Sequence, residues 1–230
     1  MGKEKMTKLE KQWVLYDVGN SAFVMLVSTI IPIYFKNMAT ASGISAANST
    51  AYLSYAISIS TILVALLGPV CGAAADNKGF KKPLFTAFMM IGVIACAAMG
   101  IPKTWLAFLV VFVIAKVGFS GSLIFYDSML VDVTTDERMD EVSSHGYAWG
   151  YIGSCIPFVA CLGVVLGAKP LGIGMQTAMI IAFIITALWW LLSSVPLLRS
   201  YRQKYFAEVN GHVVKDSFKR LGKTFAELVK

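Results

Sequence analysis

Long runs without any charged residue constrain this chain more than any other feature. Residues 37–75, 83–102 and 170–198 contain no Asp, Glu, Lys or Arg. A helix needs about 20 mostly apolar residues to cross a bilayer, and only helices and closed barrels satisfy their backbone hydrogen bonds there. The runs lack the residue-by-residue alternation of a barrel strand. The sequence therefore predicts an all-α polytopic membrane protein.

Composition excludes the soluble alternatives. Of 230 residues, 57% are hydrophobic and 14% are charged, with a mean hydropathy of +0.69. Soluble domains carry about 25% charged residues, and disordered chains or secreted disulfide scaffolds also differ in composition. We predict a short N-terminus, residues 1–12, a six-helix bundle, residues 13–198, and a tail or linker, residues 199–230. The predicted spans are 13–35, 51–75, 83–101, 105–128, 145–167 and 175–198.

Lysine and arginine gather on one side of the predicted bundle. Residues 1–12, the second-to-third and fourth-to-fifth loops, and the tail contain most of them, whereas the opposite loops contain Lys36, Lys103 and Lys169. The positive-inside rule then predicts that both termini are cytoplasmic. We expect the membrane to be a bacterial cytoplasmic membrane. The net charge of +7 accordingly indicates topology and attraction to anionic lipid headgroups, and not a nucleic-acid partner.

The loop after the second predicted span combines small and charged residues. Residues 72–82 read Gly-Ala-Ala-Ala-Asp-Asn-Lys-Gly-Phe-Lys-Lys, and a carboxylate at a helix C-terminus needs a nearby cation to offset the helix dipole. A helix stop followed by cytoplasmic lysines would account for this composition. The spacing Gly-x3-Asp-x2-Gly-x-Lys, however, resembles the signature loop between spans two and three of the major facilitator superfamily.

That resemblance implies a gating role for the loop. In the superfamily, the acid of this loop meets the start of a helix in the other half of the transporter and latches the outward-facing state. Asn77 and Phe80 stand where the superfamily often has arginine, so part of its usual charge network is missing. The implied gating residues are Gly72, Asp76, Gly79, Lys81 and Lys82.

Three further segments resemble a narrower branch, the vacuole-effluxer-like (Atg22/UMF1) transporters. They are residues 13–23, WVLYDVGNSAF, residues 125–132, FYDSMLVD, and residues 142–153, VSSHGYAWGYIG. Members of the superfamily have two six-helix bundles joined by a cytoplasmic segment after span six. The resemblance therefore implies that this chain is the N-terminal bundle, and that its partner is a second bundle on the same or a separate chain.

Two pairs of glycines form ridges at which helices could approach closely. Gly68 and Gly72 lie four residues apart in the second predicted span, and Gly146 and Gly150 do so in the fifth. Small residues at this spacing favour helix packing in membranes. In the superfamily, spans two and five face the opposite bundle, but packing within this bundle explains each ridge equally well.

Ionisable residues at membrane depth mark candidate sites, because burying them in lipid is costly. Lys116 lies about 17 Å into the fourth predicted span at 1.5 Å per residue, near the middle of a core about 30 Å thick. It should pair with an acid, bind an anionic substrate group or lose its proton. Asp17 lies about 6 Å into the first span, where it could instead fix the cytoplasmic end of that span.

The resemblance adds that spans one and four line the central cavity. A site there would offer both charges, which suits a zwitterion such as an amino acid and matches the amino-acid efflux attributed to fungal relatives. An acid and a base in one cavity could also couple transport to protons. Asp127 departs from the branch, where an amide is expected, and so does Lys116. The predicted substrate- and proton-binding residues are Asp17, Asn20, Lys116, Ser120, Tyr126 and Asp127.

The remaining polar features predict no metal or cofactor site. Cys71, Cys96, Cys155 and Cys161 lie within predicted spans as apolar filler, and His145 and His212 are isolated. The acidic segment 132–141 is interpreted as a solvated turn. In the tail, apolar residues at alternating spacings of four and three predict an amphipathic basic helix at the membrane surface, or a linker helix packed on the bundle; they are Val214, Phe218, Leu221, Phe225 and Leu228.

These features favour one function over two others. The favoured hypothesis is the N-terminal half of a secondary active transporter, a symporter or antiporter that moves a small polar solute such as an amino acid by alternating access around a midplane site. The alternative is a self-standing six-helix oligomeric channel or an assembly or regulatory module. An enzyme would need a nucleophile–base pair or paired carboxylates at one depth, and only Asp17 and Asp127 are candidates, without a matching motif.

Overall fold

The computed structural model describes residues 5–206, and this part of the chain consists of helices without any strand. The all-α prediction is confirmed, and six helical segments are long and apolar enough to cross a membrane. The helices are α1 (Lys8–Ser28), α2 (Ile30–Ala41), α3 (Ala46–Ala75), α4 (Lys81–Ala98), α5 (Trp105–Ser128), α6 (Leu130–Val133), α7 (Met139–Leu166) and α8 (Met175–Ser200), with a short 3-10 turn at Asp136–Arg138.

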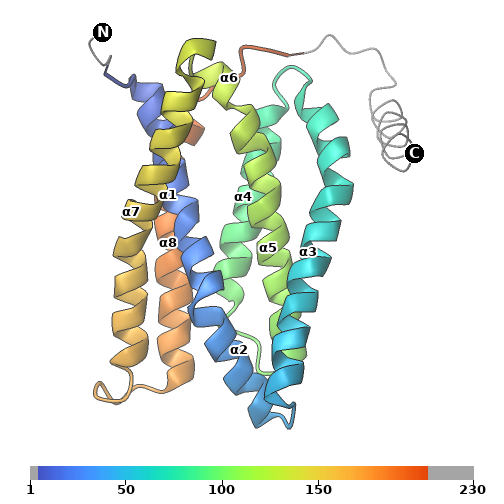
Figure 1. The fold of residues 1–230 in the computed structure, drawn as a ribbon, viewed down its shortest axis with the longest axis vertical. Helices are drawn as coiled ribbons and strands as arrows, with labels where there is room; N and C mark the ends of the chain where they lie inside the picture. Colours follow the sequence, from blue (N-terminus) through green and yellow to red (C-terminus); the bar gives the residue numbers. More distant parts are fainter. Residues whose placement is uncertain (1–4, 207–230) are drawn as a thin grey trace.

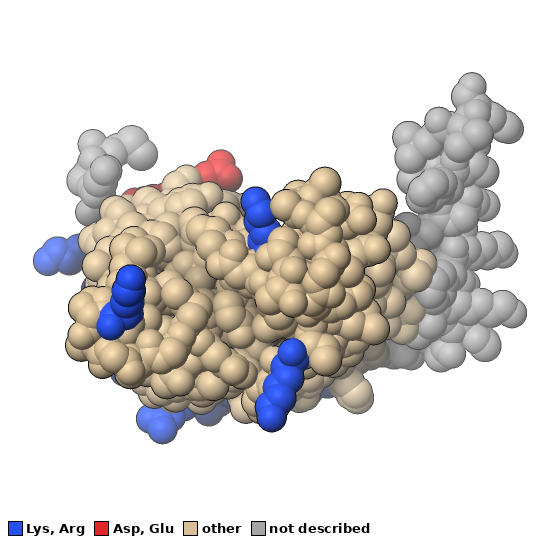
Figure 2. Space-filling model, turned by 90° about the horizontal axis from the view of Figure 1, so that it is seen from below, with Lys and Arg blue, Asp and Glu red and all other residues tan. Residues whose placement is uncertain are grey.

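The helices form two groups that run along the long axis of the molecule (Figure 1). The first group is α1, α7 and α8, and the second is α3, α4 and α5, with α4 packed against α8 where the groups meet. Both described ends of the chain lie at the same end of the bundle, at the top of Figure 1. Few charged side chains are visible at the opposite end, which Figure 2 shows from below.

The first predicted span is broken into two helices. Thr29 leaves the helical conformation (φ −124°, ψ −67°), and its hydroxyl donates to the carbonyl of Met25. Pro32 follows three residues later and has no N–H to continue the helical hydrogen bonds. The helix also begins at Lys8, earlier than the predicted residue 13, because Thr7 and Glu10 form a reciprocal capping box.

Aromatic side chains fill the centre of the bundle, where α1, α4, α5 and α8 meet. Two glycines bring α4 and α5 into backbone contact, because a Cβ on Gly118 would lie 2.3 Å from the backbone nitrogen of Gly92. Such a crossing requires glycine on both helices. The largest fully buried aromatic residues are Tyr16, Phe23, Phe35, Phe85, Phe108, Phe112, Phe125, Phe183, Trp190 and Tyr201.

Candidate functional site

Helices α1, α5 and α7 enclose a cavity of about 360 Å³. It lies in the half of the bundle nearer both described chain ends, because its walls come from residues 13–25 of α1, the last turns of α5 and the first half of α7. Its polar and aromatic lining consists of Trp13, Asp17, Asn20, Ser21, Phe119, Tyr126, Asp127, Ser143, Tyr147 and Tyr151.

Four of the six predicted binding residues line this cavity, namely Asp17, Asn20, Tyr126 and Asp127. Asn20 is 2% exposed, and its side-chain amide donates to Oδ1 of Asp17 over 3.3 Å. Asp17 is half-buried, whereas Asp127 is exposed at the mouth of the cavity. The cavity thus holds one carboxylate in its wall and one at its edge.

Lys116 and Ser120 do not line the cavity. Their spacing places both on the face of α5 that carries Phe119, Leu123 and Asp127, further from the chain ends. The ammonium of Lys116 lies 4.9 Å from the centre of the Phe119 ring, so Lys116 contacts a cavity-lining ring from outside the cavity. Within residues 5–206, no salt bridge joins Lys116 to an acid.

Trp13 and Tyr126 line the cavity from α1 and α5 and bind each other. The indole N–H of Trp13 donates to the backbone carbonyl of Tyr126 over 3.1 Å, and the hydroxyl of Tyr126 donates to the carbonyl of Trp13 over 3.2 Å. Their rings stack with centroids 4.3 Å apart. Tyr16 adds a 2.7 Å hydrogen bond to Ser122 one turn away. Together, the Trp13–Tyr126 pair and the Tyr16–Ser122 hydrogen bond fix α1 against the end of α5.

Gly146 and Gly150 pack against α1 inside this bundle. A Cβ on Gly150 would lie 2.9 Å from Oδ2 of Asp17, and one on Gly146 would lie 2.9 Å from the Trp13 ring. These contacts agree with the interpretation that this glycine ridge packs within the bundle, and not with the alternative that it faces a second bundle. The other ridge differs, because a Cβ on Gly68 would lie 3.4 Å from the Ile124 side chain of α5, while a Cβ on Gly72 would meet nothing within 4 Å.

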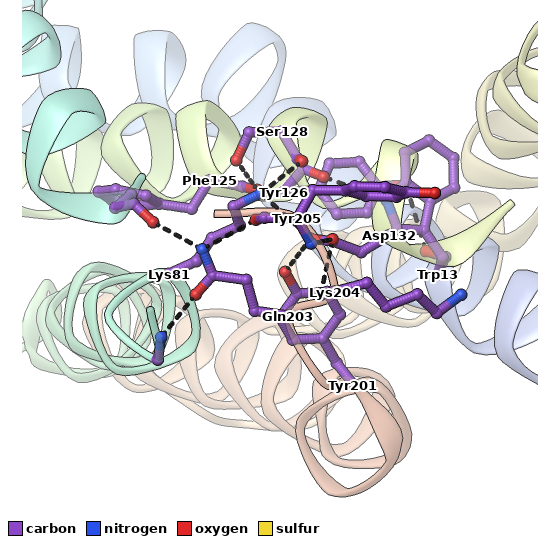
Figure 3. Close-up of polar contacts among 12 residues, drawn as sticks. Trp13, Lys81, Phe125, Tyr126, Ser128, Asp132, Tyr201, Gln203, Lys204 and Tyr205 are labelled. Atoms are coloured by element: carbon purple, nitrogen blue, oxygen red, sulfur yellow. Dashed lines mark hydrogen bonds and ion pairs between the residues drawn. The ribbon is translucent and has the colours of Figure 1, made fainter. Parts of the chain in front are cut away.

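A second polar cluster surrounds Asp132 at the same end of the bundle (Figure 3). The ammonium of Lys81 lies 3.1 Å from Oδ2 of Asp132 and 3.0 Å from the carbonyl of Ser128. The hydroxyl of Tyr201 donates to the same carboxylate oxygen over 2.5 Å. The interpretation of segment 132–141 as a solvated turn is wrong for Asp132, which is fully buried.

The segment after α8 is held by the other oxygen of Asp132. The backbone N–H groups of Lys204 and Tyr205 each donate to Oδ1 over 2.9 Å. Burial raises the pKa of Asp132, but the hydrogen bonds from Tyr201, these two amides and Lys81 outweigh it and place this pKa below its ordinary value. Burial and the Asp132 carboxylate raise the pKa of Tyr201.

The loop between α3 and α4 joins this cluster through Gln203. The backbone N–H of Gly79 donates to the Gln203 side chain over 2.9 Å, and the Gln203 amide donates to the carbonyl of Ala75 over 3.0 Å. Gly79 has φ +81°, which favours glycine. Asp76 is exposed and Lys82 half-buried, so Lys81 is the loop residue that points into the bundle.

Sequence reasoning missed several of these residues. Tyr147, Tyr151 and Ser143 lie in a quoted motif but had no assigned role. Glu10 is 2% exposed, accepts from Thr134 over 2.7 Å and lies 3.3 Å from Arg138.

The predicted tail helix and His212 lie outside the described residues. Among residues 5–206, no three His, Cys, Asp or Glu side chains are arranged to hold a metal ion.

A six-helix membrane bundle with a polar cavity between its helices is the architecture of one half of a major-facilitator-type transporter. The chain belongs to the family described as vacuole effluxer Atg22 like, whose model matches residues 6–230. It is 43% identical, over 98% of its length, to the "Uncharacterized MFS-type transporter YxiO" of Bacillus subtilis (strain 168). The resemblance inferred from the motifs is confirmed. The chain spans about half of that relative, since the match covers 54% of it.

Proposed function

We propose that this chain is the N-terminal half of a secondary active transporter that moves a small polar solute of the amino-acid class across a bacterial cytoplasmic membrane. The observation that carries the proposal is the cavity between α1, α5 and α7, with Asp17 in its wall. A volume of about 360 Å³ lies in the usual range of small-molecule sites. The family and the name of the relative both point to transport.

A second six-helix bundle would complete the transport path. The α3 and α7 spans are the least buried of the six within this chain, and large apolar side chains are exposed along both, including Ile59, Leu66, Ile152 and Ile156. Lipid can cover part of such a surface, but Gly72 offers a flat site for another helix. The partner bundle would close the cavity and rock against this one.

The Asp132 cluster would form the conformational gate. It connects the α3–α4 loop, the end of α5 and the segment that follows α8, through Lys81, Gln203 and Tyr201. A rocking motion that strains any of these three elements is thereby transmitted to the others. Asp76, exposed at the same loop, is free to contact the partner bundle. The gate and both chain ends would lie on the cytoplasmic side.

Proton coupling would use the cavity carboxyl groups. Asp17 and Asp127 are the two ionisable acids in the lining, and protonation of either would change the charge that a solute meets. Lys116 contacts the Phe119 ring but does not line the cavity, so it would act on a solute or a proton only when the cavity extends toward it in another conformation.

Counterflow into proteoliposomes tests the transporter hypothesis. The protein with its second bundle is reconstituted with unlabelled amino acids inside, and uptake of labelled amino acids is followed. A carrier gives saturable uptake that depends on the trapped solute, which we expect. A self-standing channel would give non-saturable flux from residues 1–230 alone, without any stimulation by trapped solute, and this result would overturn the proposal.

A further inference from the structure

The charged side chains that line the cavity between α1, α5 and α7 are all negative. Asp17 and Asp127 contribute carboxylates, and the described residues that line it include no Lys, Arg or His. Lys116 is the cation on this face of α5, and its ammonium lies 4.9 Å from the centre of the Phe119 ring without lining the cavity. An anionic group inside the cavity would therefore meet two acids without a cation beside them.

The Asp17 carboxylate has few hydrogen-bond donors from the described residues. Its one side-chain hydrogen bond among the described residues comes from Asn20, over a long 3.3 Å. The wall behind it is the backbone of α7 at Gly150, where even a methyl group would lie 2.9 Å from Oδ2. A partner can thus reach this carboxylate from the cavity alone. A cation that enters the cavity would supply the opposite charge that no salt bridge gives Asp17 within residues 5–206.

Aromatic side chains supply the rest of the lining. Trp13 and Tyr126 present stacked rings, and Tyr147 and Tyr151 on α7 are 68% and 66% exposed although both line the cavity. The faces of such rings attract cations, and organic ammonium groups in particular, because they combine charge with an apolar surface. Hydrated metal ions lack that apolar surface, and the two carboxylates are on different helices at different depths.

From these observations we infer that the cavity selects a small organic ammonium ion, whose positive group lies between Asp17 and the rings of Tyr147 and Tyr151. This inference rests on the proposed function, since it names the substrate class of the same site. It narrows the amino-acid class to solutes with a net positive charge, such as basic amino acids or amines. Lys116 would repel a second positive group of the solute that reached past Phe119, and would thereby limit the length of the solute in that direction.

Calorimetric binding to the detergent-solubilised protein with its second bundle tests this inference through pairs of similar shape. The pairs are choline with its uncharged carbon isostere dimethylbutanol, cadaverine with pentanediol, and lysine with norleucine. We expect at least one cation to bind at least about tenfold more tightly than its partner, and Asp17→Asn to remove that preference. Asp140→Asn, an exposed acid outside the cavity, is the matched control and should keep it.

The outcomes separate the substrate class from transport itself. Equal binding of charged and uncharged partners, or no binding of any probe, overturns the ammonium site even if counterflow of another solute shows that the protein is a transporter. A preference for cations that Asp17→Asn leaves intact also overturns it. Selective cation binding without any counterflow would support the site and would contradict the proposed transport function. Because Asp127 is exposed, Asp127→Asn gives a second variant that should fold and should weaken cation binding.

Discussion

Trp13 and Tyr126 bind each other through two hydrogen bonds that run in opposite directions, each from a side chain to the other residue's backbone carbonyl. Their rings stack between these bonds at 4.3 Å. The two residues are separated by more than a hundred positions, so the pair joins the start of α1 to the end of α5. Both residues line the cavity.

Tyr126→Phe removes one of the two hydrogen bonds and keeps the ring. The buried carbonyl of Trp13 then loses the hydroxyl that donates to it, and we expect the free energy of unfolding to fall by about 1 kcal/mol. The measurement is the thermal unfolding midpoint of the purified protein in detergent. Tyr55→Phe, at a tyrosine 61% exposed on α3, is the control that should leave the midpoint unchanged. An equal midpoint for Tyr126→Phe and the wild type would show that the hydrogen bond from the Tyr126 hydroxyl contributes nothing to stability.

Gly150→Ala should disturb solute binding more than folding. The added methyl would lie 2.9 Å from Asp17 Oδ2 and 3.0 Å from Ser21 Oγ, so the Asp17 side chain must move within the cavity. We expect about a tenfold loss in the apparent affinity for transported solute, since misplacing one charged contact costs about 1.4 kcal/mol or more. Gly163→Ala on the same helix, where a Cβ meets nothing within 4 Å, should transport normally. Equal affinity in both variants would contradict the role of Asp17 in the cavity.

Asp132→Asn should destabilise the bundle strongly. The substitution leaves the ammonium of Lys81, 5% exposed in its side chain, without its carboxylate, and breaking a buried pair costs about 3–5 kcal/mol. Tyr201→Phe removes one hydrogen bond from the same carboxylate and should cost less. Thermal unfolding ranks the two variants, with Asp136→Asn at an exposed site as the control. If Asp132→Asn and Asp136→Asn unfold at the same temperature, the cluster does not stabilise the fold.

The same cluster predicts a component of acid lability. The pKa of Asp132 is lower in the folded protein than its ordinary value, so its contribution is fully present above the unfolded pKa of about 3.9. That contribution is lost as the pH falls through the lower folded pKa. A pH series of unfolding midpoints should therefore show a decline below about pH 4 that is reduced in Asp132→Asn. Parallel curves for the two proteins would contradict this linkage.

Sequence alone identified the spans and the family because both depend on local patterns. Uncharged runs of sufficient length fix the number of spanning helices, and the motifs at residues 13–23, 125–132 and 142–153 fix the family. The break at Thr29 was signalled by Pro32, whose missing N–H interrupts a helix. The early start of α1 was signalled by the capping box of Thr7 and Glu10. A helix start placed at the beginning of the apolar run misses this box.

The rotation of each helix could not be read from the sequence. Helices that are apolar all round show no single hydrophobic face, so the sequence could not decide whether Lys116 and Ser120 share a cavity with Asp17. It could not decide, for the same reason, whether Gly146 and Gly150 contact α1 or another bundle. Asp132 was misinterpreted because it begins a charged segment, whereas its burial depends on Lys81 and Tyr201, which are distant in sequence.

Uptake by the Asp17→Asn variant tests the central claim, that this cavity is the solute site, most directly. The protein with its second bundle is reconstituted in parallel as wild type, Asp17→Asn and Asp140→Asn, and initial counterflow rates of a labelled basic amino acid are compared at equal protein content. Loss of the charge that faces the solute should lower the rate of Asp17→Asn at least about tenfold, while Asp140→Asn matches the wild type. Equal rates in all three proteins would show that the solute binds elsewhere.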